Sequence, residues 1–392
     1  MPYKDLGLPL GFVFWVVPAL FFKIFGPYLI SLVKAQVFIN IISGLAFRSI
    51  LKSLGVDPGI RVAAVLLFCI SYSFFNFWPW YNHTVIVWEF VSLSFLLRYL
   101  LREQKNIALL LASSFFVTLS FFTKQDGGGL AIVLSMALLI YYVIVRQNIK
   151  PLLLYTGFLV GFFCLMIIPF IPFDFGYWFN HGQFPHHSRF SLRDVIGELL
   201  SNSPWIKFYA LVIVLILLAQ VKDVKSFFWN EREMIFLLLT LGILAQATIF
   251  QVTSYTPPDN NIFFHSFAFA YILTKLQLPI NFQRPSRILV LTALIMLWWS
   301  GAYWGYIERV VTRILPPTEE TDPDVVTRHT YVINTDTTID ASAWKFSDLE
   351  VFKKVYMPEP TVAGIERVMN LEVVKQNKNL KVLNMFLPGI TV

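Results

Sequence analysis

The chain has 392 residues, of which 56% are hydrophobic and 14% are charged, and its mean hydropathy is +0.63. Soluble globular proteins carry about 25% charged residues, so this composition excludes an ordinary soluble protein. The formal net charge of +7 is spread over the connections between apolar runs, which excludes a nucleic-acid-binding patch. It fits the excess of Lys and Arg on the cytoplasmic side of membrane proteins.

Long uncharged runs indicate the class of membrane protein. Residues 152–173 contain no charge, and about 20 apolar residues are enough for a helix to cross a bilayer. The runs lack the alternation of transmembrane β-strands. We therefore predict an all-α polytopic membrane protein in the cytoplasmic (plasma) membrane. About ten spans are expected, at residues 29–53, 62–78, 84–101, 107–123, 129–146, 151–173, 205–221, 234–252, 261–279 and 287–306.

The first apolar stretch and the two cysteines have simpler interpretations. Residues 8–26 are interrupted by Pro18 and Lys23, so they form either a span or a helix on the membrane surface. We assign residues 1–27 to an extracytoplasmic juxtamembrane segment. Cys69 and Cys164 lie inside apolar runs and without zinc-ligand spacing, as expected of small buried hydrophobic residues.

Basic residues predict the orientation of the spans, because cytoplasmic connections are enriched in Lys and Arg. One set of alternate connections holds fourteen basic residues and the other holds seven, so the first set is expected to be cytoplasmic. The N-terminus, the connection at 124–129 and the tail after Trp304 then lie outside. The fourteen are Arg48, Lys52, Arg61, Arg98, Arg102, Lys105, Arg146, Lys150, Lys222, Lys225, Arg232, Lys275, Arg284 and Arg287.

The last part of the chain changes character. We divide the chain into a multi-span domain at 28–308 and a small extracytoplasmic α/β tail at 309–392, which the ending suggests is incomplete. A linker is expected at 316–324 and a strand at 380–387. The segment 357–370 predicts a short helix with Thr361 as its cap.

All six histidines fall outside in this topology, which points to a polar site there. The longest outer loop, 174–204, contains His186, His187 and Arg189. Arg189 offers a planar fork of donors that suits a phosphate. The His-His pair is compatible with a divalent metal ion, but no carboxylate accompanies it, so no cofactor is assigned with certainty.

Two further outer connections carry polar residues. Asp259, Asn260 and His265 either form a polar turn after two prolines or line a wall that hydrogen-bonds a sugar. Asn82 and His83 belong to an Asn-His-Thr glycosylation sequon at the start of a span. Glu89 lies within that span, where an acid is expected to face a cavity or a partner.

The stretch SFFTKQDGGG, residues 120–129, places a cation, an amide and a carboxylate between two apolar runs. The glycines predict a sharp turn or a close approach to a ligand. Lys124 taken alone favours a lysine that extends its ammonium to the membrane surface. Lys124, Gln125 and Asp126 together favour a site that meets an anionic headgroup.

Two stretches, at 3–26 and 121–129, resemble segments of known enzymes. YKDLGLPLGFVFWVVPALFFKIFG has a tyrosine and an acid, a proline-containing step, an apolar stretch and Phe-Gly. This resembles the segment after the first outer loop of GT-C membrane glycosyltransferases, such as bacterial lipid A aminoarabinose transferases and protein O-mannosyltransferases. FFTKQDGGG resembles their turn after an apolar helix.

The resemblance implies transfer of a sugar from a polyprenyl-phosphate donor to a lipid, glycan or protein acceptor outside the membrane. In a single displacement, an acid activates the acceptor while cations hold the departing lipid phosphate. The resemblance assigns Asp5 as the catalytic acid and Lys4, Lys124 and Arg189 as phosphate ligands. Asn82 and His83 stand where the family has a second outer acid.

The family usually has one more span and an acidic loop before the segment that begins here. The resemblance therefore implies an N-terminally truncated chain, a misassigned start or an inactive protein. A transporter or flippase of a lipid-linked substrate is the alternative, although such proteins place ionisable residues at mid-membrane and show repeats. A polymerase or ligase that uses lipid-linked glycans differs mainly in its acceptor.

Overall fold

The computed structural model describes residues 11–71, 78–101, 105–173, 175, 191–253, 263–314, 344–346, 348 and 356–376. The chain divides into two compact units. The first comprises Met1–Ile24 and Ser31–Trp304, and the second comprises Phe25–Ile30 and Gly305–Val392. The domain boundaries predicted from the sequence remain a prediction.

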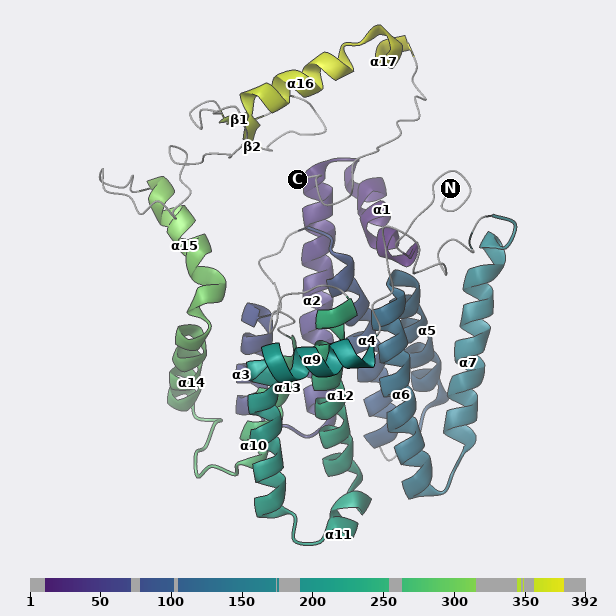
Figure 1. Ribbon diagram of the computed structural model, residues 1–392, viewed down its shortest axis with the longest axis vertical. Helices are drawn as coiled ribbons and strands as arrows, with labels where there is room; N and C mark the ends of the chain where they lie inside the picture. Colours follow the sequence, from purple (N-terminus) through teal and green to yellow (C-terminus); the bar gives the residue numbers. More distant parts are fainter. Residues whose placement is uncertain are drawn as a thin grey trace. The chain divides into compact units, whose positions relative to one another are not determined.

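The first unit is a bundle of helices that run up and down (Figure 1), so the predicted all-α membrane fold is confirmed. Its helices are α1 (Val13–Phe25), α2 (Leu29–Ser53), α3 (Pro58–Ser71), α4 (Tyr81–Leu101), α5 (Ile107–Thr123), α6 (Gln125–Arg146), α7 (Lys150–Ile167), the 3-10 turn η1 (Ile168–Phe170), α9 (Leu192–Asn202), α10 (Pro204–Gln220), α11 (Val224–Trp229), α12 (Glu231–Thr253), α13 (Phe263–Lys275), α14 (Pro285–Trp298) and α15 (Ser300–Ile314), which continues into the second unit.

Within the described residues, five helical segments are long and apolar enough to cross a membrane: α2, α4, α6, α12 and Lys150–Phe170. The pair α9 and α10 makes a sixth if it is counted as one span, with a bend of 84° between its two helices. Each predicted span overlaps a helix of the structure. The multi-pass class is confirmed, whereas the number of ten remains a prediction.

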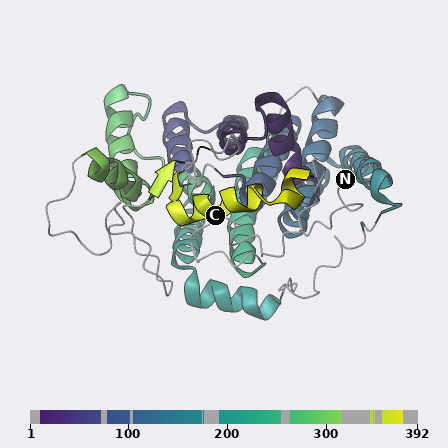
Figure 2. The ribbon, with the colours of Figure 1, turned by 90° about the horizontal axis from the view of Figure 1, so that it is seen from above.

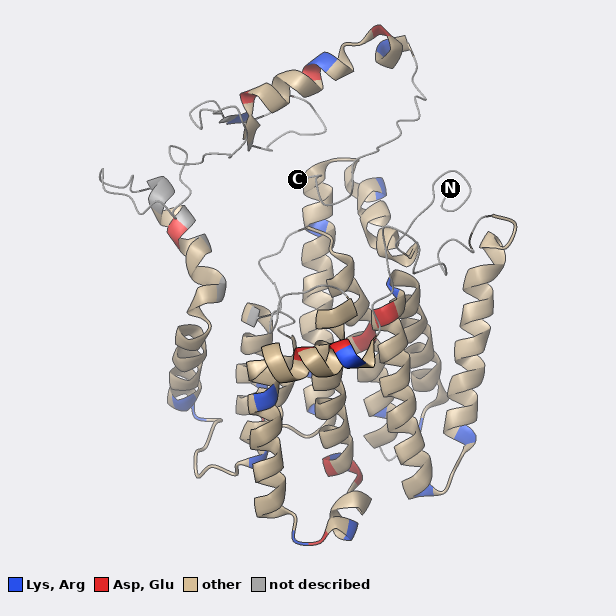
Figure 3. Ribbon diagram, in the orientation of Figure 1, with Lys and Arg blue, Asp and Glu red and all other residues tan. Residues whose placement is uncertain are grey.

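The basic connections share one end of the bundle, which we call the basic end. There α2, α4, α6, α10 and α13 finish, and α3, α5, α7, α12 and α14 begin. Figure 3 shows Lys and Arg gathered at this end. Arg146 pairs with Glu231, and Gln283 donates to Asp57 at 2.8 Å, so these contacts join the connections to one another. The other end, where Lys124 lies, is called the opposite end.

Helix α4 is the centre of the bundle. A helix that is hydrophobic all round is expected to be buried, and α4 is covered by its neighbours over almost its whole length. Stacked and edge-on phenylalanine rings join α4 to α2, α3 and α13. The ring centres of Phe47 and Phe68 lie 4.7 Å apart, and Phe267 lies 4.9 Å from Phe47 and 5.4 Å from Phe90.

Helix α1 begins against the opposite end of α5. The Gly11 N–H donates to the Thr123 carbonyl at 3.2 Å, and the Phe12 ring lies 4.7 Å from that of Phe170. Thirteen residues form a helix about 20 Å long, which is shorter than the hydrocarbon core of a bilayer. Of the two interpretations of residues 8–26, these contacts favour the surface helix.

The second unit contains β1 (Trp344–Phe346), β2 (Tyr356–Pro358), α16 (Glu359–Met369) and α17 (Glu372–Gln376). The strands pair antiparallel, with Trp344 opposite Pro358. The helix predicted in 357–370 is confirmed as α16, but the predicted cap is wrong. Pro358 occupies the cap position, because Pro360 already presets the backbone of the first turn. The expected linker at 316–324 and strand at 380–387 lie outside the described residues.

Candidate functional site

One residue joins α5 to α6 at the opposite end. Lys124 is extended (φ −156°, ψ 125°), its N–H donates to the Ser120 carbonyl, and its own carbonyl accepts from the Gly128 N–H at 2.9 Å. Helix α6 therefore begins at Gln125, and the three glycines that follow Asp126 already lie inside the helix. The prediction of a glycine turn at 127–129 is wrong, because the helix begins before the glycines.

The glycines serve helix packing. A Cβ on Gly128 would overlap the backbone of Phe121 in α5, far inside van der Waals contact. A Cβ on Gly127 would lie 2.5 Å from the Phe250 ring of α12. Gly129 faces open space. The close approach expected from the sequence exists, but it is an approach to protein neighbours rather than to a ligand.

The Lys124 ammonium is held in place at this junction. Its Nζ lies 2.8 Å from Asp126 Oδ2, and Asp126 Oδ1 accepts the Gly127 N–H at 2.8 Å. The two side chains are only 12% and 25% exposed. Burial lowers the pKa of Lys124, and Asp126 opposes that shift. The alternative of a lysine extended to the membrane surface is wrong, since the carboxylate two residues on draws the ammonium inward.

Two aromatic rings face the same ammonium from other helices. Nζ lies 5.4 Å from the ring centre of Tyr81 in α4 and 5.2 Å from that of Phe250 in α12. A cation over aromatic faces is attracted by their negative π surface, more strongly where water is excluded. Four helices thus fix the position of one cation.

Asn82 and His83 lie in the first turn of α4, next to Tyr81. Both are buried, Asn82 being 4% exposed, and the His83 ring lies 4.3 Å from Trp80. The interpretation of Asn82 as a glycosylation acceptor is wrong, because its amide is enclosed by the bundle. Asn82 Oδ1 has no hydrogen-bond partner within the part of the chain that the structure describes.

Glu89 lies deeper along α4 and has the partner that an acid inside a span requires. Its Oε1 accepts from Gln246 Nε2 of α12 at 2.7 Å, and the residue is 1% exposed. It is about 10 Å further along the helix axis than Asn82. A contact between Glu89 and a sugar remains a prediction.

The Glu89–Gln246 bond predicts a difference between two variants. Glu89→Gln keeps an amide oxygen for Gln246, so we expect little change in the free energy of unfolding. Glu89→Leu leaves the buried amide without its acceptor, which costs about 1–3 kcal/mol. Thermal unfolding of the purified variants in detergent measures both. Equal stability of Glu89→Leu and the unaltered chain would contradict the bond.

His265 belongs to a second group at the same end, formed by α10, α13 and α14. Its Nδ1 lies 2.8 Å from the Tyr209 hydroxyl, and Phe264, Trp205 and Trp299 surround its ring at 4.2–5.6 Å between ring centres. The sequence reasoning missed Trp205 and Tyr209. Both residues belong to an aromatic cluster at the start of an apolar helix, at the same end of the bundle as His265. That cluster is the feature of the sequence that could have identified them.

Helix α9 closes this side of the bundle. It lies across the ends of α10 and α12, and Figure 2 shows it along the edge of the bundle. Ser203, between α9 and α10, donates to Gln251 Oε1 of α12 at 2.7 Å. Gln251 follows Phe250, so α9 is connected to the helix that contacts Lys124. Sequence reasoning missed both Ser203 and Gln251.

Seven predicted site residues lie outside the described part of the chain: Lys4, Asp5, His186, His187, Arg189, Asp259 and Asn260. Their roles remain predictions. The described ranges contain no group of three His, Cys, Asp or Glu residues placed to hold a metal ion. Of the predicted residues that are described, the structure gathers Asn82, His83, Lys124, Gln125 and Asp126 at one place. Glu89 lies deeper along α4 with Gln246, and His265 belongs to the group with Tyr209.

Comparison with known proteins finds no matching family model and no matching curated protein. Two solved structures are similar, both of ArnT from Cupriavidus metallidurans. The apo structure has 11% identity and a TM-score of 0.45 and covers 80% of this chain. The structure bound to undecaprenyl phosphate has 14% identity, a TM-score of 0.44 and 79% coverage. This chain spans 56% of the length of either ArnT chain.

Proposed function

We propose that this protein is a GT-C type membrane glycosyltransferase, which moves a sugar from a polyprenyl-phosphate donor to an acceptor outside the cytoplasmic membrane. The observation that carries the proposal is the Lys124 ammonium. It is nearly buried at the opposite end, paired with Asp126 and faced by the rings of Tyr81 and Phe250.

Such a cation suits the leaving group of this reaction. When the sugar leaves a lipid phosphate, negative charge develops on the phosphate oxygens. A positive charge already oriented in a site with little water stabilises that change without further reorganisation. Lysine serves phosphates as a point charge rather than as a planar fork. The half-buried Tyr81 ring beside Lys124 offers apolar surface to the first isoprene unit.

The proposed reaction is a single displacement. The acceptor oxygen attacks the anomeric carbon, the bond from that carbon to the phosphate oxygen breaks, and the lipid phosphate leaves with the electron pair. The proton of the acceptor passes to a carboxylate, for which Asp5 is the candidate. Lys4, Lys124 and Arg189 are proposed for the phosphate. Asn82, His83, Gln125, Asp126, His186, His187, Asp259, Asn260, His265 and Glu89 are proposed for the sugar and the site walls.

The test is a transfer assay in liposomes with the full chain, a labelled polyprenyl-phosphate sugar and an acceptor lipid. We expect Lys124→Ala and Arg189→Ala each to reduce transfer by about 10²–10³-fold, as when one charge-stabilising donor is removed. Lys207→Ala is the matched control, since Lys207 lies exposed at the same end and, within the described ranges, donates to the Leu200 carbonyl.

Two outcomes would count against the proposal. Full transfer by both variants would show that neither Lys124 nor Arg189 belongs to the site. Movement of the labelled lipid across the bilayer without sugar transfer would select the alternative, a flippase.

A further inference from the structure

A cleft of about 640 Å³ opens at the basic end, far along the bundle from Lys124. It is formed by the ends of α4, α6 and α11 and the start of α12. Leu100, Leu101 and Val145 give it an apolar wall. Its other lining residues are charged or amphipathic: Arg146, Trp229, Asn230, Glu231, Arg232 and Glu233.

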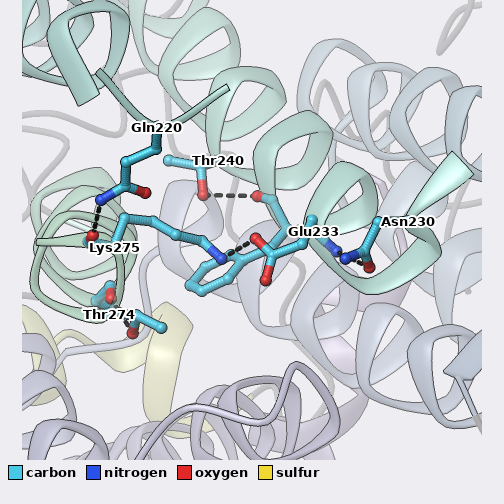
Figure 4. Close-up of polar contacts among 8 residues, drawn as sticks. Gln220, Asn230, Glu233, Thr240, Thr274 and Lys275 are labelled. Atoms are coloured by element: carbon cyan, nitrogen blue, oxygen red, sulfur yellow. Dashed lines mark hydrogen bonds and ion pairs between the residues drawn. The ribbon is translucent and has the colours of Figure 1, made fainter. Parts of the chain in front are cut away.

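Both carboxylates of the cleft already have a cation. Glu231 forms a double contact with the Arg146 guanidinium, in which Nη2 lies 2.9 Å from Oε2. Glu233 pairs with Lys275, which comes from α13 (Figure 4), and the Asn230 side chain accepts the Glu233 N–H. Neither carboxylate is therefore left to attract a cationic ligand.

Arg232 is the cation that remains. It is exposed and forms no ion pair with any residue in the described ranges. Its guanidinium lies over Gly55, where an added Cβ would be 3.2 Å from Nη1. Gly55 has φ +76°, which suits glycine, and the missing side chain leaves room for the guanidinium. The planar fork is thereby placed at the mouth of the cleft.

A further cation strengthens the positive field. Lys105 lies between α4 and α5, and its Nζ donates to the carbonyls of Tyr99 and Leu100 at 2.9 and 2.8 Å. Partial burial and then Arg146 lower the pKa of Lys105, while Glu231 opposes them. The ammonium is thus close enough to the Arg146–Glu231 pair to feel both charges. Among the described residues, four cations outnumber two carboxylates in the cleft and at its border: Arg146, Arg232, Lys105 and Lys275 against Glu231 and Glu233.

The shape of the cleft indicates a lipid. Its lining combines apolar side chains, charged side chains and the exposed Trp229. Tryptophan favours the level of the lipid headgroups, and basic pockets between spans suit anionic headgroups. The combination of an apolar lining with a guanidinium that has no ion pair in the described ranges matches an acyl chain attached to a phosphate headgroup.

We propose that this cleft binds one anionic glycerophospholipid. Arg232 holds the headgroup phosphate, Trp229 lies at the glycerol level, and the half-buried Leu101 and Val145 contact the start of an acyl chain. The site is separate from the sugar-transfer site and does not depend on the proposed reaction.

The experiment measures lipid retention by native mass spectrometry on the full chain in detergent, titrated with phosphatidylglycerol. We expect one retained lipid, and about a tenfold weaker binding for Arg232→Gln, because a charged hydrogen bond is lost. Arg287→Gln is the matched control, since Arg287 is exposed at the same end but outside the cleft. It is expected to bind within about twofold of the unaltered chain.

Three results would overturn the proposal. Equal weakening by both variants would indicate general attraction to basic surface. Retention of phosphatidylcholine equal to that of phosphatidylglycerol would show that headgroup charge does not contribute to binding. Full displacement of the lipid by millimolar inorganic phosphate would show that the cleft takes free phosphate instead. Thermal unfolding of Arg232→Gln without lipid checks its fold, which we expect to be intact because Arg232 is exposed and has no ion pair within the described part of the chain.

Discussion

Gly128→Ala is expected to destabilise the protein by about 3 kcal/mol or more, at the upper end of the cost of overpacking. The new Cβ would overlap the Phe121 backbone, which cannot turn aside as a flexible side chain does. Helix α5 or α6 must therefore move, and the Lys124–Asp126 pair between them moves too. The measurement is thermal unfolding in detergent together with the yield of monodisperse protein.

The neighbouring glycines are the controls. Gly129→Ala meets open space and replaces a helical glycine, so stability should stay constant or rise by about 0.5–1 kcal/mol. Gly127→Ala should fall between the two, because the Phe250 ring and Val85 can yield. If Gly128→Ala and Gly129→Ala unfold at the same temperature, the close packing of α5 and α6 is wrong.

The second large effect is expected at the Lys124–Asp126 pair. Lys124→Met alone leaves a carboxylate without its cation in a mostly buried site, which should cost about 2–4 kcal/mol. The double variant Lys124→Met/Asp126→Asn removes both charges, and we expect it to recover most of that loss. Thermal unfolding of the two single variants and the double variant gives the interaction energy of the pair.

Transfer assays on the same variants distinguish a structural role of Lys124 from a role in the reaction. We expect the double variant to be folded and yet to lose transfer by about 10²-fold or more, because the phosphate has lost its cation. Lys207→Ala again serves as the control. A double variant that is stable and fully active would show that Lys124 only supports the fold.

The overall class could be predicted from the sequence because it depends on local properties. A run such as 152–173 has no charge, and lipid leaves its backbone only intrahelical partners, so a helix follows. The alternation of basic connections along the sequence predicted that Arg146, Lys150 and Arg232 share one end of the bundle, where α6 ends and α7 and α12 begin. The sequence also predicted that Glu89 faces a cavity or a partner, because burying a carboxylate among apolar side chains costs free energy.

The partners themselves were decided by tertiary structure. Gln246 lies 157 residues from Glu89 along the chain, and Tyr209 lies 56 from His265. The spacing of residues within one helix does not show which distant helix packs against it. The choice of neighbour depends on how the apolar faces of all the helices pack together.

The stretch SFFTKQDGGG shows the division most clearly. Its composition alone predicted a junction between two apolar helices with a cation and a carboxylate beside it. Whether the glycines turn, bind or pack was settled by Phe121 and Phe250, which lie opposite them. Whether Lys124 reaches outward or inward was settled by Asp126 and by the rings of Tyr81 and Phe250. A sequence determines which groups are present and which helices form, but the environment of a buried charge exists only once those helices are packed.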